Sequence, residues 1–390
     1  MRAGYRKDAS MKSSATNVAD DGLELPLVVA YLCGCAVRQE VPDAMRLASV
    51  DVDEVMRLAK RHMLVSCVAA AFMAAGLGGK RMRVEVEHGM WRVMQIQADW
   101  ELVRQGLERE GIWYCPLKGA VVKDLYPVRG MRQMSDFDVL FDASRAEDVR
   151  RIMEGLEFTC EHYGTGVHDV YHKPMVTNLE MHRALFSPVA KEQFAAFYNN
   201  VKDRLIKDDG NDFGWHMDVS ECYLYLVAHE HKHFSASGTG LRSLLDVYVY
   251  LCAYGTQIDW EWVVTKAHEL GIGEFEESNR ELALRLFGGE ALTNDDMRTV
   301  AYMAGSGTYG TLKNGVRNKV AENGGGLCGK VRYLGQRLFP PASYLAEAYP
   351  AYFRHKATIP FAYLHRFWRG ATVSRKMVAA QLRTLWDDEH

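Results

Sequence analysis

The most informative motif of the chain is Arg132-Gln133-Met134-Ser135-Asp136-Phe137-Asp138-Val139-Leu140. Polar and apolar residues alternate from Asp136 to Val139, so we predict a strand with Asp136 and Asp138 on one face and with Phe137 and Val139 turned to the core. Two carboxylates held side by side repel each other unless a cation lies between them. Because Mg²⁺ prefers oxygen ligands, the spacing predicts a magnesium-binding strand.

A third carboxylate is expected from a second short strand, Asn178-Leu179-Glu180-Met181-His182, in which Glu180 lies between apolar neighbours. Three carboxylates on adjacent strands can hold two metal ions for an in-line displacement at phosphorus. We therefore predict that Asp136, Asp138 and Glu180 are both the catalytic residues and the metal ligands. An Asp-x-Asp pair alone is common at solvated strand ends, so this prediction depends on the surrounding sequence.

A Lys-Gly turn upstream of the Asp-x-Asp pair supplies that context. Gly119 lets the backbone approach a phosphate closely. Residues 120–125 are predicted to form a helix whose first amides face the same anion. Lys118 adds a compact positive charge. Together these features predict a phosphate-binding turn that works with the carboxylates.

These motifs resemble those of the uncharacterised nucleotidyltransferases of the polymerase-β-like superfamily. The family's Lys-Gly turn, Arg-x-x-Ser-Asp-x-Asp motif and Leu-Glu-x-His motif correspond to residues 118–119, 132–138 and 179–182. A second block, His-x-x-Lys-His-Phe followed by a glycine turn and Arg-x-x-x-Asp, matches residues 229–246. Residues 338–366 are similar to the family's C-terminal signature. The family commonly has serine or glycine where this chain has Ala120, which removes a hydroxyl contact to phosphate and leaves the backbone cradle.

The resemblance implies an α+β fold: a small mixed or antiparallel nucleotidyltransferase sheet, N-terminal helices and a larger C-terminal helical domain. It implies transfer of a nucleoside monophosphate from an NTP donor to a hydroxyl or phosphate of an acceptor, with Mg²⁺ or Mn²⁺ as cofactor. The acceptor stays open among a sugar, an antibiotic-like small molecule, a peptide, a protein and an RNA end.

The resemblance also implies roles for the remaining motif residues. The nucleotide-binding residues are Lys118, Gly119, Arg132 and Ser135, of which Ser135 is expected to fix the loop. The residues expected to contact the acceptor or the phosphates, or to support such contacts, are His182, Lys232, His233, Arg242 and Asp246. Asp246 lies one helical turn after Arg242, so we expect it to orient that side chain through an ion pair. The alternative is a solvated pair that contributes only tenths of a kcal/mol.

Two other classes of protein stay open. His229-Glu230-His231-Lys232-His233 satisfies the pattern His-Glu-x-x-His, in which two histidines one helical turn apart bind zinc and the glutamate is the general base of a metalloprotease. The match is short, and no third ligand is set in a matching motif. The other alternative is a catalytically inactive module that senses nucleotide.

Length and composition limit the remaining choices. A chain of 390 residues suits two or three subdomains, and 48% hydrophobic with 25% charged residues is typical of a soluble globular protein. The net charge of −3 gives no global argument for nucleic-acid binding. None of the eight cysteines belongs to a Cys-x-x-Cys pair, which excludes zinc-ribbon and thioredoxin-like classes and indicates reduced, mostly buried thiols.

We divide the chain into a disordered tail (1–22), an N-terminal helical segment (23–111), a nucleotidyltransferase α/β core (112–210) and a C-terminal helical domain (211–390). The tail lacks the apolar centre of a signal peptide. The apolar run of residues 25–37 is about half the length that spans a bilayer. We therefore expect a cytoplasmic protein without a transmembrane segment.

The C-terminal domain becomes basic and rich in aromatic residues from about residue 313. Between Lys313 and Arg383 there are 13 lysines or arginines, against the two acidic residues Glu322 and Glu347. The favoured interpretation is packing, with the stems of the basic side chains covering aromatic rings. The alternative is a surface for an anionic partner or an anionic membrane.

Overall fold

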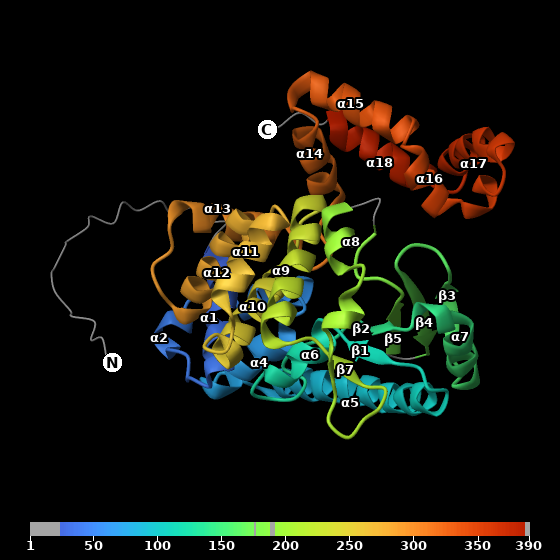
Figure 1. The fold of residues 1–390 in the computed structure, drawn as a ribbon. Coiled ribbons are helices and arrows are strands. Elements are labelled where there is room, and N and C mark those ends of the chain that lie inside the picture. The colour runs from blue at the N-terminus through green and yellow to red at the C-terminus, as the bar shows by residue number, and fades with distance from the viewer. Residues whose placement is uncertain (1–23, 175–176, 188–191, 387–390) are drawn as a thin grey trace.

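The computed structural model describes residues 24–174, 177–187 and 192–386, and its fold is α+β, which confirms the predicted class. Figure 1 shows a bundle of helices beside a small sheet, with a further group of helices projecting from the bundle. The tail predicted for residues 1–22 lies outside the described residues.

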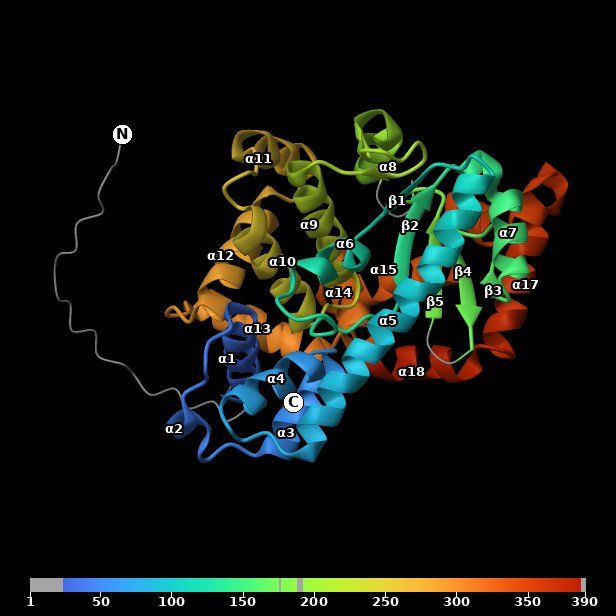
Figure 2. The same ribbon diagram turned by 90° about the horizontal axis from the view of Figure 1, so that it is seen from below.

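Five helices precede the sheet. They are α1 (Glu24–Arg38), α2 (Ala44–Leu47), α3 (Val52–Arg61), α4 (Val65–Ala74) and α5 (Lys80–Arg109). Asp51 starts α3 by accepting hydrogen bonds from the amides of Asp53 and Glu54, so two of the free N–H groups at that end are satisfied. The long helix α5 runs from the helical bundle across the sheet, as both views show (Figures 1 and 2).

The sheet has five strands in the order β1-β2-β5-β4-β3. The strands are β1 (Tyr114–Pro116), β2 (Phe137–Phe141), β3 (Thr159–His162), β4 (His168–Lys173) and β5 (Thr177–His182). The pairs β5·β4 and β4·β3 are antiparallel, whereas β2 pairs with β5 in parallel, so the small sheet is mixed. Between β2 and β3 lie the short turn η2 (Ala143–Arg145) and helix α7 (Ala146–Gly155).

The two faces of the sheet differ because side chains alternate along a strand. On one face Phe137, Val139 and Phe141 of β2 pack against Trp100 and Val103 of α5 in a fully apolar layer. The ring of Trp100 stacks on that of Phe137 at 5.0 Å between centroids. The polar residues of the same strands therefore face the other way, towards the helical bundle.

The C-terminal helices and the N-terminal helices share one hydrophobic core. After α8 (Glu192–Tyr198), η3 (Val201–Arg204), β6 (Ile206–Lys207) and β7 (Trp215–His216), the chain forms α9 (Val219–Ala236), α10 (Leu241–Tyr254), α11 (Trp260–Glu269), α12 (Gly273–Gly288) and α13 (Asn294–Ser306). Fully buried residues of α1, such as Leu32, belong to the same apolar cluster as Leu245 of α10 and Phe287 of α12. The two predicted helical segments are thus one packed unit.

The last helices form what we call the C-terminal arm. It comprises α14 (Leu312–Glu322), α15 (Gly326–Leu338), α16 (Ala342–Ala348), η4 (Pro350–Phe353), η5 (Lys356–Thr358), α17 (Ile359–Ala371) and α18 (Arg375–Trp386), and it projects from the bundle in Figure 1. Its own buried apolar cluster holds Val316, Tyr333 and Leu385. Phe339 and Trp368 are 68% and 60% exposed, so the packing predicted for the aromatic residues of this segment applies to only some of them.

Two smaller findings concern the whole chain. No helix among the described residues combines the length and the apolar character that crossing a bilayer requires. All eight cysteines are free, and Cys252 and Cys328 are exposed while five of the others are buried.

Candidate active site

One cavity of about 360 Å³ lies between the polar face of the sheet and the helical bundle. Its walls include all twelve residues that the sequence analysis assigns to the site. They are Lys118, Gly119, Arg132, Ser135, Asp136, Asp138, Glu180, His182, Lys232, His233, Arg242 and Asp246. The first eight belong to the sheet and its loops, and the last four belong to α9 and α10. Motifs far apart in sequence therefore meet in one cleft.

The three carboxylates come from the parallel pair of strands. Asp138 of β2 is directly opposite Glu180 of β5 in the register of the sheet, and Asp136 immediately precedes β2. Burial raises the pKa of Asp136, and the negative charges of Asp138 and Glu180 raise it further. This corner of the cavity therefore carries an excess of negative charge that a cation would relieve.

Asp138 is held by two partners. Lys118 Nζ donates to Asp138 Oδ1 at 2.7 Å, and His182 Nε2 lies 2.8 Å from the same oxygen. Burial by itself would raise the pKa of Asp138, but Lys118 and His182 outweigh it and the pKa lies well below its ordinary value. Both contacts use Oδ1, so within the described residues Oδ2 stays available as a metal ligand. His182 is thus bonded to Asp138, and its Nε2 lies 3.7 Å from Glu180 Oε2.

The Lys-Gly turn differs from its prediction in one respect. The residue in the left-handed region is Lys118, with φ of 48°, and Gly119 begins the four-residue helix α6 (Gly119–Val122), which continues into η1 (Lys123–Leu125). The amides of Ala120 and Val121 already donate to the carbonyls of Leu117 and Lys118, so they do not face an anion as the sequence predicts. Both hydrogen bonds join residues three apart in sequence, so the first turn closes on the amides of Ala120 and Val121.

Gly119 is required by a neighbouring side chain. A Cβ atom on Gly119 would lie 2.5 Å from Nη1 of Arg132. The absence of a side chain thus lets the guanidinium group pack against the turn. Position 119 therefore needs a glycine for packing, independently of the predicted approach of a phosphate.

Asp246 binds Arg132, which corrects the predicted ion pair with Arg242. Arg132 Nε and Nη2 donate to the two oxygens of Asp246 at 2.8 Å each, and the hydroxyl of Tyr126 also donates to Asp246 Oδ1 at 2.8 Å. Both charged side chains are almost fully buried. The helical spacing does allow Arg242 to reach Asp246, but the guanidinium of Arg132 makes the two-pronged contact with the carboxylate.

Arg242 is left as a cation that faces the cavity. Its Nη1 donates to the carbonyl of Gln133 at 3.1 Å. Burial lowers the pKa of Arg242, and the positive charge of Arg132 lowers it further, so an anion in the cavity would stabilise the charged form. Lys232 also lines the cavity, and burial followed by the charge of Lys118 lowers its pKa. Ser135 Oγ bonds to Asp136 Oδ1 at 2.9 Å, in keeping with a role in fixing the loop.

His168 is a cavity residue that sequence reasoning missed. It stands directly opposite His182 in the antiparallel pair of β4 and β5, and the rings lie 4.9 Å apart. His168, Glu180 and His182 form the one group of three ligand side chains among the described residues that lie close enough together to bind one metal ion. Within the same described chain, Nδ1 of each histidine is buried without a hydrogen-bond partner. The sequence does show a histidine at the start of a strand. Its position opposite His182 depends on the strand register, which the sequence pattern does not reveal.

The His-Glu-x-x-His pattern does form a pair of histidines on one face of α9. His229 Nε2 and His233 Nε2 lie 3.2 Å apart. However, the carboxylate of Glu230 is buried and accepts hydrogen bonds from Ser243 and Asn279, so it is fixed inside the bundle instead of facing a metal-bound water. The described residues place no third ligand with the two histidines. This geometry weighs against the metalloprotease.

One wall of the cavity carries carboxylates from a parallel strand pair, and the facing wall carries cations from the helical bundle. A family model described as uncharacterised nucleotidyltransferase matches residues 48–288, more than half of the chain, and the protein belongs to that family. The resemblance predicted from the motifs at residues 118–246 is thereby confirmed, whereas the block at residues 338–366 lies outside the matched region and stays a prediction. Membership indicates nucleotidyl transfer as the general activity and an NTP as substrate. Neither a curated protein nor a solved structure matches the chain.

Proposed function

We propose that this protein transfers a nucleoside monophosphate from an NTP to a hydroxyl or phosphate group of an acceptor, with the aid of Mg²⁺ or Mn²⁺. The observation that carries the proposal is the register of β2 and β5, which puts Asp138 opposite Glu180 and both next to Asp136. The opposite wall of the same cavity supplies the cations Lys232 and Arg242.

The carboxylate corner fits a divalent cation. Asp136, Asp138 and Glu180 offer oxygen ligands, and their mutual repulsion, seen in the raised pKa of Asp136, favours a positive ion among them. His168 and His182 offer nitrogen ligands beside Glu180. A divalent ion bound there would neutralise charge on the triphosphate and polarise the reacting phosphorus. The residue set suits Mn²⁺ at least as well as Mg²⁺, because imidazole is a better ligand for transition metals.

The protein's own residues would bind and align the reactants. In the reaction an acceptor oxygen bonds to the α-phosphorus of the NTP. The bond from that phosphorus to the bridging oxygen breaks, and pyrophosphate leaves with the electron pair. Lys118, Lys232 and Arg242 would hold the negative charge of the triphosphate at the wall of the cavity. Glu180 lies on the strand next to Asp138, where its carboxylate can accept the proton of an acceptor hydroxyl. Catalysis of this kind is mainly positioning and charge neutralisation.

The first test measures nucleotide binding and turnover in the same samples. The melting temperature is measured with each NTP, with and without Mg²⁺ or Mn²⁺, because a ligand that binds only the folded protein raises it. Pyrophosphate release is then followed for the NTP that gives the largest shift. We expect Asp138→Asn to abolish transfer while the fold stays intact, and Glu180→Gln, at a less buried position, to do the same.

Asp142→Asn is the matched control. Asp142 directly follows β2, lies outside the cavity, and accepts hydrogen bonds from Ser144 that an asparagine oxygen can also accept. Full activity in Asp138→Asn would refute the assignment of the carboxylates. A metal-dependent shift without any pyrophosphate release would favour the nucleotide-sensing module.

A further inference from the structure

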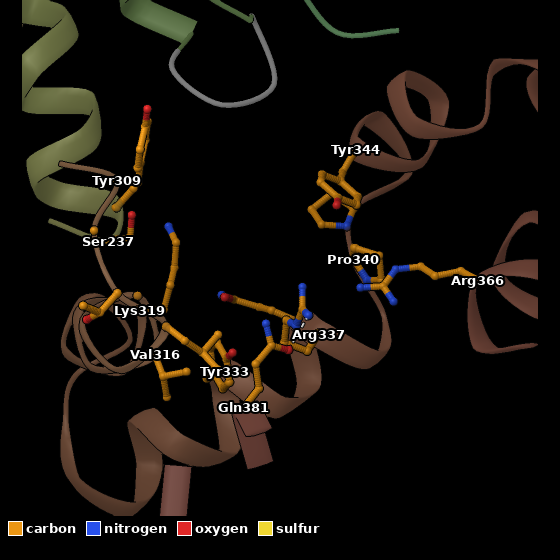
Figure 3. Close-up of a pocket in the computed structure, with 17 residues that line it drawn as sticks. Ser237, Tyr309, Val316, Lys319, Tyr333, Arg337, Pro340, Tyr344, Arg366 and Gln381 are labelled. Carbon is orange, nitrogen blue, oxygen red and sulfur yellow. Dashed lines mark hydrogen bonds between the residues drawn. The ribbon is translucent and has the colours of Figure 1, made fainter. Parts of the chain in front are cut away.

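A second cavity lies in the C-terminal arm, next to the first. Its volume is about 660 Å³, within the range of sites for small molecules. Helices α14 and α15 form one side, and the Pro340-Pro341 turn with Tyr344 of α16 forms the other (Figure 3). We call this cavity the arm groove.

The arm groove combines flat apolar surfaces with positive charge. Tyr309, Tyr333 and Tyr344 supply aromatic rings, and Pro340 adds a further apolar surface. Its cations are Lys319, Arg337 and Arg366, and no aspartate or glutamate belongs to its lining. Such a surface favours a ligand that has a ring and carries negative charge.

Arg366 is the cation that is free to bind such a ligand. Lys319 bonds to Glu322 at 2.7 Å, and Arg337 Nη2 donates to Gln381 Oε1 at 2.5 Å. Arg366, in contrast, is half-buried and has no hydrogen bond or ion pair with any described residue. In Figure 3 its guanidinium group reaches towards Pro340 at the edge of the groove. An anion seated between the aromatic rings would therefore satisfy its donors.

The arm groove and the candidate active site share a wall. Tyr309 lines both cavities, and its neighbours Thr308 and Gly310 line one each. The loop that carries Tyr309 is fixed at both ends: the amide of Thr308 donates to the carbonyl of Arg61 at 3.1 Å, and the amide of Thr311 donates to the carbonyl of Ser237 at 2.9 Å. A molecule in the groove would thus end beside the cavity that holds Asp138 and Glu180.

We propose that the arm groove binds the acceptor of the reaction, and that the acceptor is a small molecule with a flat ring and a phosphate or carboxylate group. The ring packs against the tyrosines, the anionic group bonds to Arg366, and the reacting oxygen passes Tyr309 to the α-phosphorus of the NTP. The role as acceptor rests on the proposed nucleotidyl transfer, whereas the class of ligand rests on the groove alone.

The experiment uses 1-naphthyl phosphate as the probe, titrated into the full-length protein by calorimetry. We expect saturable binding of one probe per chain, and binding at least about 10-fold weaker for 1-naphthol, which lacks the charge, and for inorganic phosphate, which lacks the ring. Arg366→Gln should weaken the probe at least about 10-fold, the usual effect of losing a hydrogen bond to a charged group. Arg369→Gln, on the same helix, exposed and outside the groove, is the matched control and should leave binding unchanged. Melting temperatures verify that both variants are folded.

A second titration, in the presence of saturating NTP and metal ion, separates the groove from the nucleotide site. Simultaneous binding of probe and nucleotide supports the inference, and displacement of the probe by the nucleotide overturns it. An equal loss of probe affinity in Arg366→Gln and Arg369→Gln also overturns it. If the nucleotide binds and the probe does not, the groove inference is wrong and the proposed function stands. If the probe binds through Arg366 and no nucleotide binds, the proposed function fails and the groove is an anion site without the acceptor role.

Discussion

The buried pair of Arg132 and Asp246 should contribute strongly to the stability of the protein. Its two hydrogen bonds of 2.8 Å join side chains that are only 7% and 10% exposed, and they connect the sheet domain to α10. Removing one member of such a pair leaves an uncompensated charge away from water, which costs about 3–5 kcal/mol of folding free energy. We therefore expect Asp246→Asn to be destabilised by about this amount. For a chain of this length that corresponds to a fall in melting temperature of roughly 4–6 °C.

The measurement is urea unfolding followed by circular dichroism for Asp246→Asn, Arg132→Met and the double variant. The double variant removes both charges, so it should be less destabilised than the sum of the single variants by about 2 kcal/mol or more. The same cycle with Arg242→Met in place of Arg132→Met is the matched comparison, and there we expect a coupling energy below about 1 kcal/mol. A larger coupling energy of Asp246 with Arg242 than with Arg132 would show that Arg132 is not the main partner of Asp246.

Three further predictions concern single residues of the cavity. Burial raises the pKa of Glu230 to about 7, so the folded protein keeps a proton that the unfolded chain releases near pH 4.5, and the stability from this group is lost as the pH rises towards 7. We expect the free energy of unfolding of Glu230→Gln to exceed that of the wild type by up to about 3 kcal/mol at pH 8 and to show no such excess at pH 5. Gly119→Ala should lower the free energy of unfolding in urea by about 1–3 kcal/mol, because its Cβ collides with Arg132. Gly155→Ala is the control and should not destabilise the protein, because a Cβ there would meet nothing within 4 Å. Equal stability of the two variants would contradict the predicted clash. His168→Ala should weaken Mn²⁺ binding about 10-fold and Mg²⁺ binding less, as measured by calorimetry on the NTP-bound protein. An equal loss of affinity for both ions would show that His168 is not a metal ligand.

The sequence was sufficient to predict which face of the sheet a side chain lies on, because the alternation of polar and apolar residues along a strand decides it. Asp138 and Glu180 each lie between apolar residues, so a strand must turn both away from the core, and the two strands could be expected in one sheet. The same alternation predicted that Phe137 and Val139 face the other way, where they pack against α5. These inferences needed no knowledge of distant contacts.

The sequence was insufficient wherever two distant elements compete for one partner. Helical spacing pairs Arg242 with Asp246, but the approach of the loop with Arg132 decides which guanidinium reaches the carboxylate. The position of His168 depends on the register of β4 against β5, which pairs it with His182. The role of Tyr309 depends on how the C-terminal arm packs beside the bundle, and no local pattern encodes that arrangement.

The position of α1 has a consequence for how the protein should be prepared. The family match begins at residue 48, after α1 has ended. Yet Val29 and Leu32 of this helix are fully buried, and a Cβ on Gly34 would lie 2.5 Å from the carbonyl oxygen of Phe287 in α12. A protein shortened to the matched region would expose the apolar surface that α1 covers and would be prone to aggregate. Sequence similarity here ends inside a folding unit, and expression should start before Glu24.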